Sequence, residues 1–142
     1  MLKSINPSKT EAWGKLNDHF LDMNLVQMKD LFKEDASRFE KFSTKFEDIL
    51  LDYSKNIITD ETMAFLNELA EQCDLKDAIE KMFSGQEINK TEGRSVLHVA
   101  LRNRSDNPVY VDGEDVMPDV RRVLKQVETF SNKVGNGFWR GY

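Results

Sequence analysis

Residues 91–104 constrain the fold of this chain more than any other stretch, because a polar stripe runs through an otherwise apolar helical pattern. At about 100° per residue, Arg94, His98 and Arg102 fall within one narrow sector of a helical wheel. Apolar residues fill most of the remaining circumference: Val96, Leu97, Val99, Ala100 and Leu101. The pattern predicts a helix over residues 91–103 that is buried on several sides.

The three polar side chains of this helix have two interpretations. Three converging donors could bind an anion such as a phosphate. Alternatively, Arg94, His98 and Arg102 pair with carboxylates on neighbouring elements and fix the packing. The burial predicted by the wheel favours pairing, because a buried ion needs fixed partners. A stripe open to solvent in a pocket, with no carboxylate nearby, would overturn this expectation.

Composition and charge are those of a globular chain. The 142 residues are 39% hydrophobic and 32% charged, which predicts one structural unit over residues 1–142 with a core of its own. A net charge of −5 argues against nucleic-acid binding. The single cysteine, Cys73, is typical of a reducing compartment. Because no apolar run could span a membrane and the first residues do not resemble a signal peptide, we expect a soluble cytoplasmic protein without a membrane partner.

The first part of the chain combines helical and extended patterns. Pro7 and the capping-box spacing of Ser8 and Glu11 predict the start of a helix. Apolar residues three or four apart continue it: Trp13, Leu16, Phe20 and Met23. A shorter helical segment follows around residues 28–32, and residues 46–53 alternate as a strand does.

Two more helices and a hairpin are expected next. Thr59 and Asp74 are suitable caps for two helices that form a helical hairpin, and Gly85 ends the second of them. The Asp112-Gly113 dipeptide predicts a short β-hairpin near residues 109–116.

A last helix begins at Pro118. Its apolar face contains Val120, Val123, Leu124, Val127, Phe130 and Val134. Gly135-Asn136-Gly137 ends it, and Trp139 begins a tail with no evident partner within the chain. The predicted fold class is mainly α with a short β-hairpin, an α+β arrangement.

The other candidate sites have plain structural explanations. As a catalytic base, His98 lacks a reaction partner beside it on the helix, and His19 and His98 are too few for a histidine-rich metal site. Cys73 closes an apolar helical face and is typical of a core residue. The acidic run over residues 112–115 suggests calcium or magnesium, but it lacks the distal glutamate of a calcium loop, and a hairpin turn explains it better.

Two further features of the last helix are structural as well. The Gly135-Asn136-Gly137 run follows a helix and precedes no strand–helix unit, so we interpret it as a helix stop and not as a phosphate cradle. Arg121 and Arg122 belong to a solvated helix face. We therefore predict no catalytic, substrate-binding or metal-binding residue within this chain.

The stretch over residues 91–104 resembles the corresponding part of the glucose-6-phosphate isomerases (phosphoglucose isomerases). Other matches follow in order along essentially the whole chain: Ile5-Asn6-Pro7, Trp13 with the Phe20 region, Asp52–Asn56, Met82–Asn89, Val111–Pro118 and Trp139–Tyr142. Several matches in sequence order are far more specific than any single one. The chain is identified as similar to this family throughout.

The resemblance implies an αβα-sandwich enzyme and a reversible aldose–ketose isomerisation of glucose 6-phosphate and fructose 6-phosphate. That reaction passes through ring opening and proton transfer by a glutamate, without a metal or organic cofactor. The family is typically a cytosolic homodimer that acts in glycolysis and gluconeogenesis.

In the family, the phosphate-binding loop and the catalytic glutamate, histidine and lysine follow the motif that ends here at Tyr142. We therefore expect an amino-terminal segment of such an enzyme, inactive alone and prone to self-association through exposed apolar faces. The alternative is a stand-alone, non-catalytic helical interaction module. The reading frame beyond Tyr142 would distinguish the two.

Overall fold

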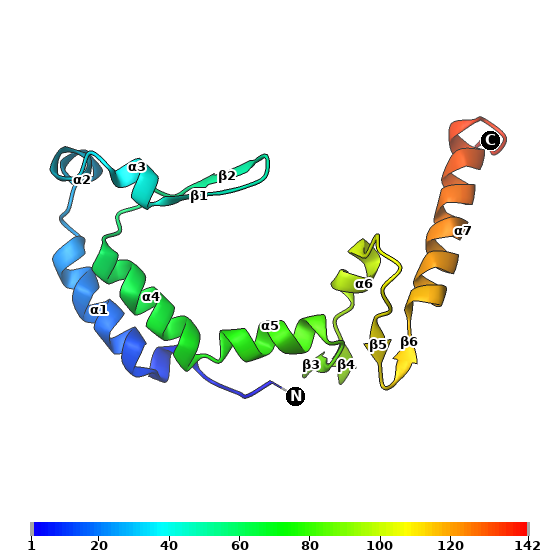
Figure 1. Cartoon of the computed structure of the whole chain (residues 1–142), viewed down its shortest axis with the longest axis horizontal. Helices are drawn as coiled ribbons and strands as arrows, with labels where there is room; N and C mark the ends of the chain where they lie inside the picture. Colours follow the sequence, from blue (N-terminus) through cyan, green and yellow to red (C-terminus); the bar gives the residue numbers. More distant parts are fainter. Residues whose placement is uncertain (1, 142) are drawn as a thin grey trace. The chain divides into compact units, whose positions relative to one another are not determined.

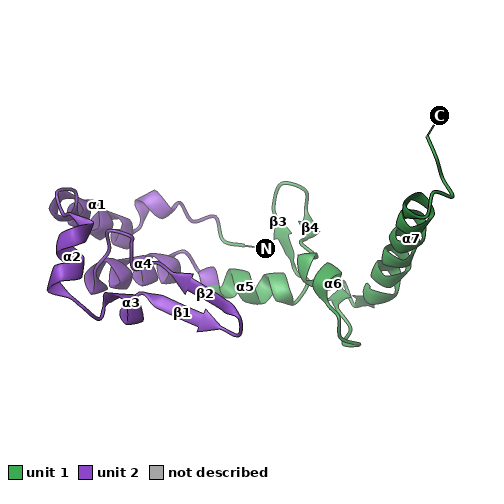
Figure 2. Cartoon of the chain, turned by 90° about the horizontal axis from the view of Figure 1, so that it is seen from above, with its two compact units in different colours: residues 1–3, 76–142 green, residues 4–75 purple. Residues whose placement is uncertain are grey.

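The structure, a computed structural model, describes residues 2–141 and contains two compact units (Figure 1, Figure 2). The first unit is Ser4–Leu75, and the second is Lys76–Tyr142 together with Met1–Lys3. The expectation that residues 1–142 act as a single structural unit stays a prediction. The mutual packing of the two helices predicted to form a helical hairpin also stays a prediction, because they fall in different units.

The first unit is built on two helices of equal length that lie side by side, α1 and α4 (Figure 1). Its elements are η1 (Pro7–Lys9), α1 (Glu11–Met23), α2 (Met28–Glu34), α3 (Arg38–Lys41), β1 (Ser43–Phe46), β2 (Ile49–Asp52) and α4 (Asp60–Gln72). Ala12 of α1 is fully buried, and its backbone N–H donates to Gln72 Oε1 of α4 at 3.0 Å. A small residue at this point lets the two helices approach closely.

The start of α1 differs from the predicted capping box. Pro7–Lys9 forms a 3₁₀ turn, capped by the Asn6 side chain, which accepts from the Ser8 N–H at 3.1 Å. The helix itself is capped by Thr10, whose Oγ1 accepts from the Trp13 N–H at 3.2 Å. The Ser8–Glu11 capping box is therefore wrong, since Ser8 belongs to the preceding turn.

The strand predicted over residues 46–53 is confirmed over Ile49–Asp52, which is β2 of a hairpin, and is wrong at residues 47 and 48, which form the turn. Antiparallel pairing joins β1 to β2, from Ser43 opposite Asp52 to Phe46 opposite Ile49. The turn between them places Glu47 at a φ of 50°, which breaks the extended run. By contrast, the predicted cap Thr59 is confirmed, because its Oγ1 accepts from the Thr62 N–H in a reciprocal capping box.

The second unit combines one long helix with short helices and hairpins (Figure 1). Its elements are α5 (Leu75–Phe83), β3 (Glu87–Asn89), β4 (Arg94–Ser95), α6 (His98–Arg102), β5 (Tyr110–Val111), β6 (Glu114–Asp115) and α7 (Met117–Gly135). The predicted hairpin near residues 109–116 and the last helix with Pro118 in its first turn are confirmed. The fold class, mainly α with short antiparallel hairpins, is confirmed as well.

The helix predicted over residues 91–103 is wrong in its first half, because that half forms the β3–β4 hairpin. Asn89 closes the turn: its Oδ1 accepts from the Thr91 and Glu92 N–H groups at 3.2 and 3.3 Å, and its carbonyl accepts from the Gly93 N–H at 2.8 Å. Gly93 adopts a φ of +60°, which glycine reaches without strain. Only α6 remains of the predicted helix.

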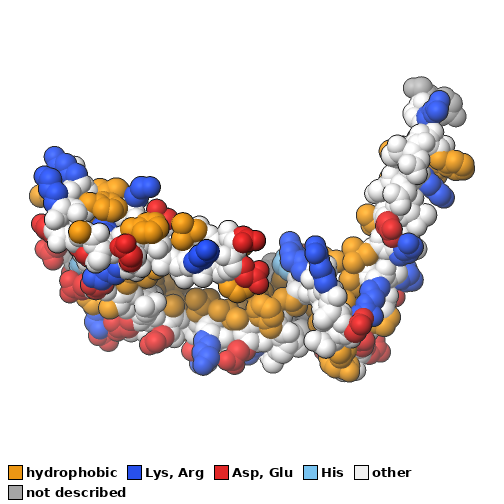
Figure 3. All heavy atoms as spheres, turned by 45° about the horizontal axis from the view of Figure 1, so that its top comes forward, with side chains coloured by type: hydrophobic (Ala, Val, Ile, Leu, Met, Phe, Trp, Pro, Cys, Tyr) orange, Lys and Arg blue, Asp and Glu red, His pale blue; other side chains and the backbone are white. Residues whose placement is uncertain are grey.

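Large apolar side chains are exposed on both units, as the orange surfaces in Figure 3 show. The apolar face of α7 is among them, with Val127 56% and Phe130 52% exposed. The prediction that Trp139 has no partner is wrong: its ring meets that of Phe130 edge-to-face at 5.4 Å. Among residues 2–141, none of the helices combines the length and the apolar character that crossing a membrane requires.

Candidate functional site

An open groove between α5 and α6 brings together two of the three polar residues that the sequence singled out. His98, Val99 and Arg102 of α6 line it, facing Met82 and Phe83 of α5, around a volume of about 550 Å³. The two polar residues are one helical turn apart, and Arg102 Nη1 donates to the His98 carbonyl at 3.4 Å. Both side chains are exposed.

Arg94, the third member of the predicted stripe, lies elsewhere. It belongs to β4, its side chain is 69% exposed, and its Nη2 pairs with Glu92 at 2.5 Å across the turn of the hairpin. The spacing of four residues that links it to His98 holds only if one continuous helix contains both. The turn at Gly93 and the extended residues after it break that continuity.

The expectation that this stripe is buried is therefore wrong, whereas its pairing with a carboxylate is confirmed for Arg94 and stays a prediction for His98 and Arg102. No carboxylate lines the α5–α6 groove, and within residues 2–141 no ion pair joins either His98 or Arg102 to a carboxylate. An imidazole and a guanidinium over an apolar floor could hold an anion weakly. General acid–base chemistry also needs a second group within hydrogen-bond reach of the reacting atoms, and the residues lining this groove supply none.

Arg38 forms the most constrained polar site of the first unit, and the sequence did not single it out. Its side chain is 2% exposed; Nε donates to the Ser54 carbonyl at 2.7 Å and Nη2 to the Asn56 carbonyl at 2.6 Å. The guanidinium also lies over the Phe42 ring, 4.7 Å from its centroid. This arginine ties α3 to the segment after β2, and nothing in local spacing predicts such a contact.

Charged groups around this arginine are held by neighbours. Hydrogen bonds from Ser54 hold the pKa of Asp52 below its usual range, because Ser54 Oγ and N–H donate to Asp52 Oδ1 at 2.6 and 2.9 Å. A hydrogen bond to Asp60 raises the pKa of Lys41, which also lies 3.6 Å from Asp35. Asp35, Lys41 and Asp60 line a pocket of about 160 Å³ together with Arg38, and within it Lys41 pairs with both carboxylates.

The other histidine, His19, joins α1 to α4. Its Nε2 lies 2.7 Å from Thr62 Oγ1, and its Nδ1 lies 3.6 Å from Glu61. On the same interface, Lys15 Nζ contacts Glu68 at 2.8 Å, and this hydrogen bond raises the pKa of Lys15. His19 therefore has a packing role, and its partners are residues of the neighbouring helix.

Further sequence candidates are placed as structural features. Residues 112–115 form the β5–β6 turn, with φ of 51° at Asp112 and 85° at Gly113, so the hairpin interpretation is confirmed. Asp115 Oδ1 accepts from the Met117 N–H at 3.0 Å and so serves the start of α7. In the part of the chain that the structure describes, no cluster of three histidine, cysteine or acidic residues could hold a metal.

The expected roles of the glycine run and of the two arginines hold, whereas the core position expected for Cys73 is not confirmed. Gly135-Asn136-Gly137 ends α7, with Gly137 at a φ of 68°. Arg121 and Arg122 lie on an exposed face, where Arg122 pairs with Asp119 at 3.1 Å. Cys73 is a free, half-buried cysteine at the end of α4.

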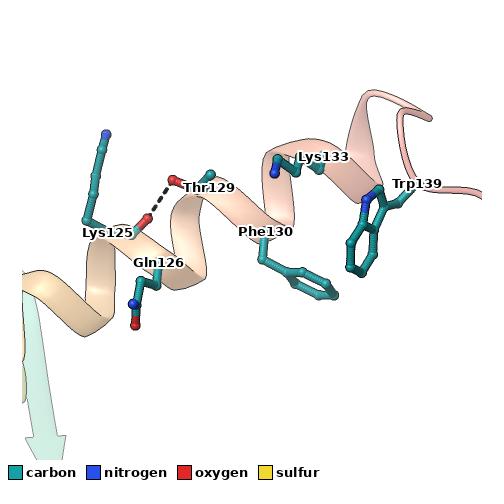
Figure 4. Close-up of a pocket in the computed structure, with 6 residues that line it drawn as sticks. All are labelled: Lys125, Gln126, Thr129, Phe130, Lys133 and Trp139. Atoms are coloured by element: carbon teal, nitrogen blue, oxygen red, sulfur yellow. Dashed lines mark hydrogen bonds between the residues drawn. The ribbon is translucent and has the colours of Figure 1, made fainter.

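A second open pocket, of about 310 Å³, lies at the end of α7 (Figure 4). Figure 4 shows Phe130 and Trp139 on one side of the helix, with Lys125 and Thr129 on the other. Thr129 Oγ1 donates to the Lys125 carbonyl at 2.8 Å, which satisfies its hydroxyl within the helix. The pocket offers aromatic surface and ammonium groups, without a nucleophile beside a base.

The family of this chain follows from a comparison of its sequence with protein-family models. Residues 52–142, more than half of the chain, match the family model of phosphoglucose isomerase. The chain belongs to the phosphoglucose isomerase family. The matched range begins at Asp52, so the resemblance seen upstream at Ile5-Asn6-Pro7, Trp13 and Phe20 stays a prediction.

Within the range shared with phosphoglucose isomerases, several motif residues have structural roles. Ser54 is buried and holds both Arg38 and Asp52. Gly85 is buried against β5, and its carbonyl accepts from Ser95 Oγ at 2.5 Å. The closing motif begins with Trp139, which packs on α7, and ends with Tyr142, which lies outside the described residues. These residues organise the fold of a phosphoglucose isomerase chain.

Proposed function

We propose that this chain supplies the amino-terminal scaffold of a glucose-6-phosphate isomerase and does not catalyse isomerisation by itself. The match of residues 52–142 to the phosphoglucose isomerase family carries the proposal. The open α5–α6 groove supports the second half of it, since His98 and Arg102 have no catalytic partner among the residues that line it.

The reaction of the complete enzyme, on this proposal, is the reversible conversion of glucose 6-phosphate and fructose 6-phosphate. It serves glycolysis and gluconeogenesis in the cytoplasm, in a homodimer. Proton transfer through an enediol(ate) then depends on residues outside this chain. The scaffold contributes packing surface, and this is consistent with the exposed apolar side chains on both units.

A coupled assay tests the catalytic part of the proposal. The purified chain is incubated with fructose 6-phosphate, and glucose 6-phosphate is detected through its dehydrogenase. We expect no rate above background at any chain concentration. A rate that rises in proportion to the chain would refute the proposal, and a commercial isomerase provides the positive control.

The second candidate is a non-catalytic helical module that binds other proteins. The exposed apolar face of α7 favours it. The intact mass of the source protein separates the two: we expect a polypeptide much larger than 16.5 kDa that isomerises fructose 6-phosphate. A source protein of 16.5 kDa without that activity would favour the module.

For the chain alone, we further propose self-association through its exposed apolar faces. Light scattering over a range of concentrations measures it. A mass of one chain throughout that range would contradict this expectation.

A further inference from the structure

The exposed face of α7 has the spacing of a coiled-coil seam. Val120, Val123, Val127, Phe130 and Val134 follow one another at alternating intervals of three and four residues. At 1.5 Å per residue, this seam extends along about 21 Å of helix. Val123 and Val134 are about half exposed, like the residues between them, so the seam is available to a partner helix.

The polar residues that flank the seam favour one arrangement of a pair. The heptad assigns three residues to one flank of the seam: Asp119, Gln126 and Lys133. The other flank contains Leu124 and Ser131. In an antiparallel pair the first flank of one helix meets the first flank of its partner. Asp119 then lies opposite the partner's Lys133, and Gln126 lies opposite the partner's Gln126.

A parallel pair lacks this match. There each flank meets the opposite flank of the partner, so Asp119 would face the partner's Leu124 and lose hydration without gaining a cation. In the single chain Asp119 already pairs with Arg122, on the side away from the seam, at 3.1 Å. Its exposed carboxylate can also accept from a second cation.

We propose that α7 binds a second copy of this chain as an antiparallel helix pair, with Val120 of each copy packed on Phe130 of the other. In the same register, Val127 of each copy packs on Val123 of the other. The inference names the surface for the self-association proposed above and is independent of isomerase activity. Because the seam contains little more than two heptads, the pair is reversible and depends on concentration.

Side chains on the opposite side of α7 support this orientation. Lys125 and Glu128 pair with each other at 2.9 Å on the outer face, where they keep that face hydrated. Figure 4 shows Lys125 on the side of the helix away from Phe130. Trp139 packs on Phe130 and lengthens the apolar surface at the end of the seam.

The first experiment compares two single substitutions by sedimentation velocity. Val127→Asp places a charge in the seam, and Asn132→Asp places the same charge on the outer face as a matched control. We expect Val127→Asp to raise the dissociation constant at least about tenfold and Asn132→Asp to change it less than about twofold. Circular dichroism of each variant at low concentration shows whether α7 still forms.

The second experiment tests orientation and does not depend on that variant. In a Cys73→Ser background, one preparation has Asp119→Cys and the other has Lys133→Cys. A short thiol cross-linker should join the two preparations when they are mixed, and join neither to itself. Cross-linking of the Lys133→Cys preparation to itself would overturn the antiparallel arrangement.

The outcomes distinguish this inference from the wider proposals. A chain that associates equally well with Val127→Asp, with α7 still helical, refutes the α7 interface but leaves self-association intact. A chain that is monomeric at all concentrations refutes both. Neither result bears on the isomerase proposal, which the coupled assay tests separately.

Discussion

Removing the donors of Arg38 should destabilise the first unit more than any surface change. The substitution Arg38→Met keeps most of the apolar stem and deletes the hydrogen bonds to the Ser54 and Asn56 carbonyls, at 2.7 and 2.6 Å. A hydrogen bond to a charged group contributes about 1.5–3 kcal/mol, so two of them amount to about 3–6 kcal/mol. Small domains have a total stability of about 5–15 kcal/mol, so this loss is a large part of it.

Urea unfolding followed by fluorescence measures the effect. In a Trp139→Phe background, Trp13 of α1 is the remaining tryptophan and reports on the first unit alone. With a urea dependence of about 1–3 kcal/mol per molar, the midpoint should fall by about 1 M or more. The control is Lys29→Met, at an exposed position of α2, for which a change within about 0.5 kcal/mol is expected. If Arg38→Met unfolds at the same midpoint as the control, the two carbonyl bonds do not support the unit as argued.

Three further predictions concern a glycine, a helix cap and acid stability. Gly85→Ala should destabilise the second unit by about 4 kcal/mol or more in a thermal melt, as strongly disruptive substitutions do. The reason is that the new Cβ would lie 2.2 Å from the Tyr110 carbonyl oxygen, at a residue whose φ is +73°. Gly93→Ala has open space around the new Cβ and should cost only about 1 kcal/mol in the same measurement. Thr59→Ala should lower the free energy of unfolding by about 1 kcal/mol in urea, and an unchanged midpoint would mean that the cap is not formed in solution. Folding lowers the pKa of Asp52, so the ionised carboxylate stabilises the folded state. This contribution to the free energy of unfolding is complete above the ordinary aspartate pKa and is lost as pH falls through the lower folded-state pKa. The free energy of unfolding should therefore fall below about pH 4, and it should fall less steeply with pH in Asp52→Asn. The same decrease with pH in both proteins would contradict this role of Asp52.

Residues typical of helix caps, turns and helix starts predicted much of the fold. Thr59 caps α4, Asp112-Gly113 turns the β5–β6 hairpin, and Pro118 lies in the first turn of α7. Each of these depends on hydrogen bonds or dihedral angles within a few residues. Such features are set locally, so a single sequence contains the information needed to predict them.

Contacts that compete with a local pattern were not predictable in this way. The residues from Arg94 to Arg102 fit a helical wheel, but the Asn89 turn and Gly93 commit the first of them to a hairpin. The candidate site changed as a result. His98 and Arg102 share one face because α6 contains both, whereas Arg94 lies outside it.

Contacts between residues far apart in the sequence could not be predicted from the spacing of residue types. Arg38 reaches carbonyl oxygens sixteen and eighteen residues away, and an arginine on a short helix is otherwise expected in solvent. Trp139 meets Phe130 because the chain reverses at Gly137. In both cases the tertiary path of the chain determines the partner.

The β1–β2 hairpin has a practical consequence for work with this chain. Among residues 2–141, each of these strands has a single neighbour, so both outer edges present unpaired backbone groups. Ile49, Leu50 and Leu51 are exposed along one of these edges. Open edges next to a run of apolar residues are templates for strand addition in concentrated or warmed samples. Lys45 is the one cation within the two strands, and it gives limited protection by charge repulsion. Storage at low concentration and low temperature, or a charge introduced at Leu50, would keep such cross-β aggregation from obscuring every solution measurement on this protein.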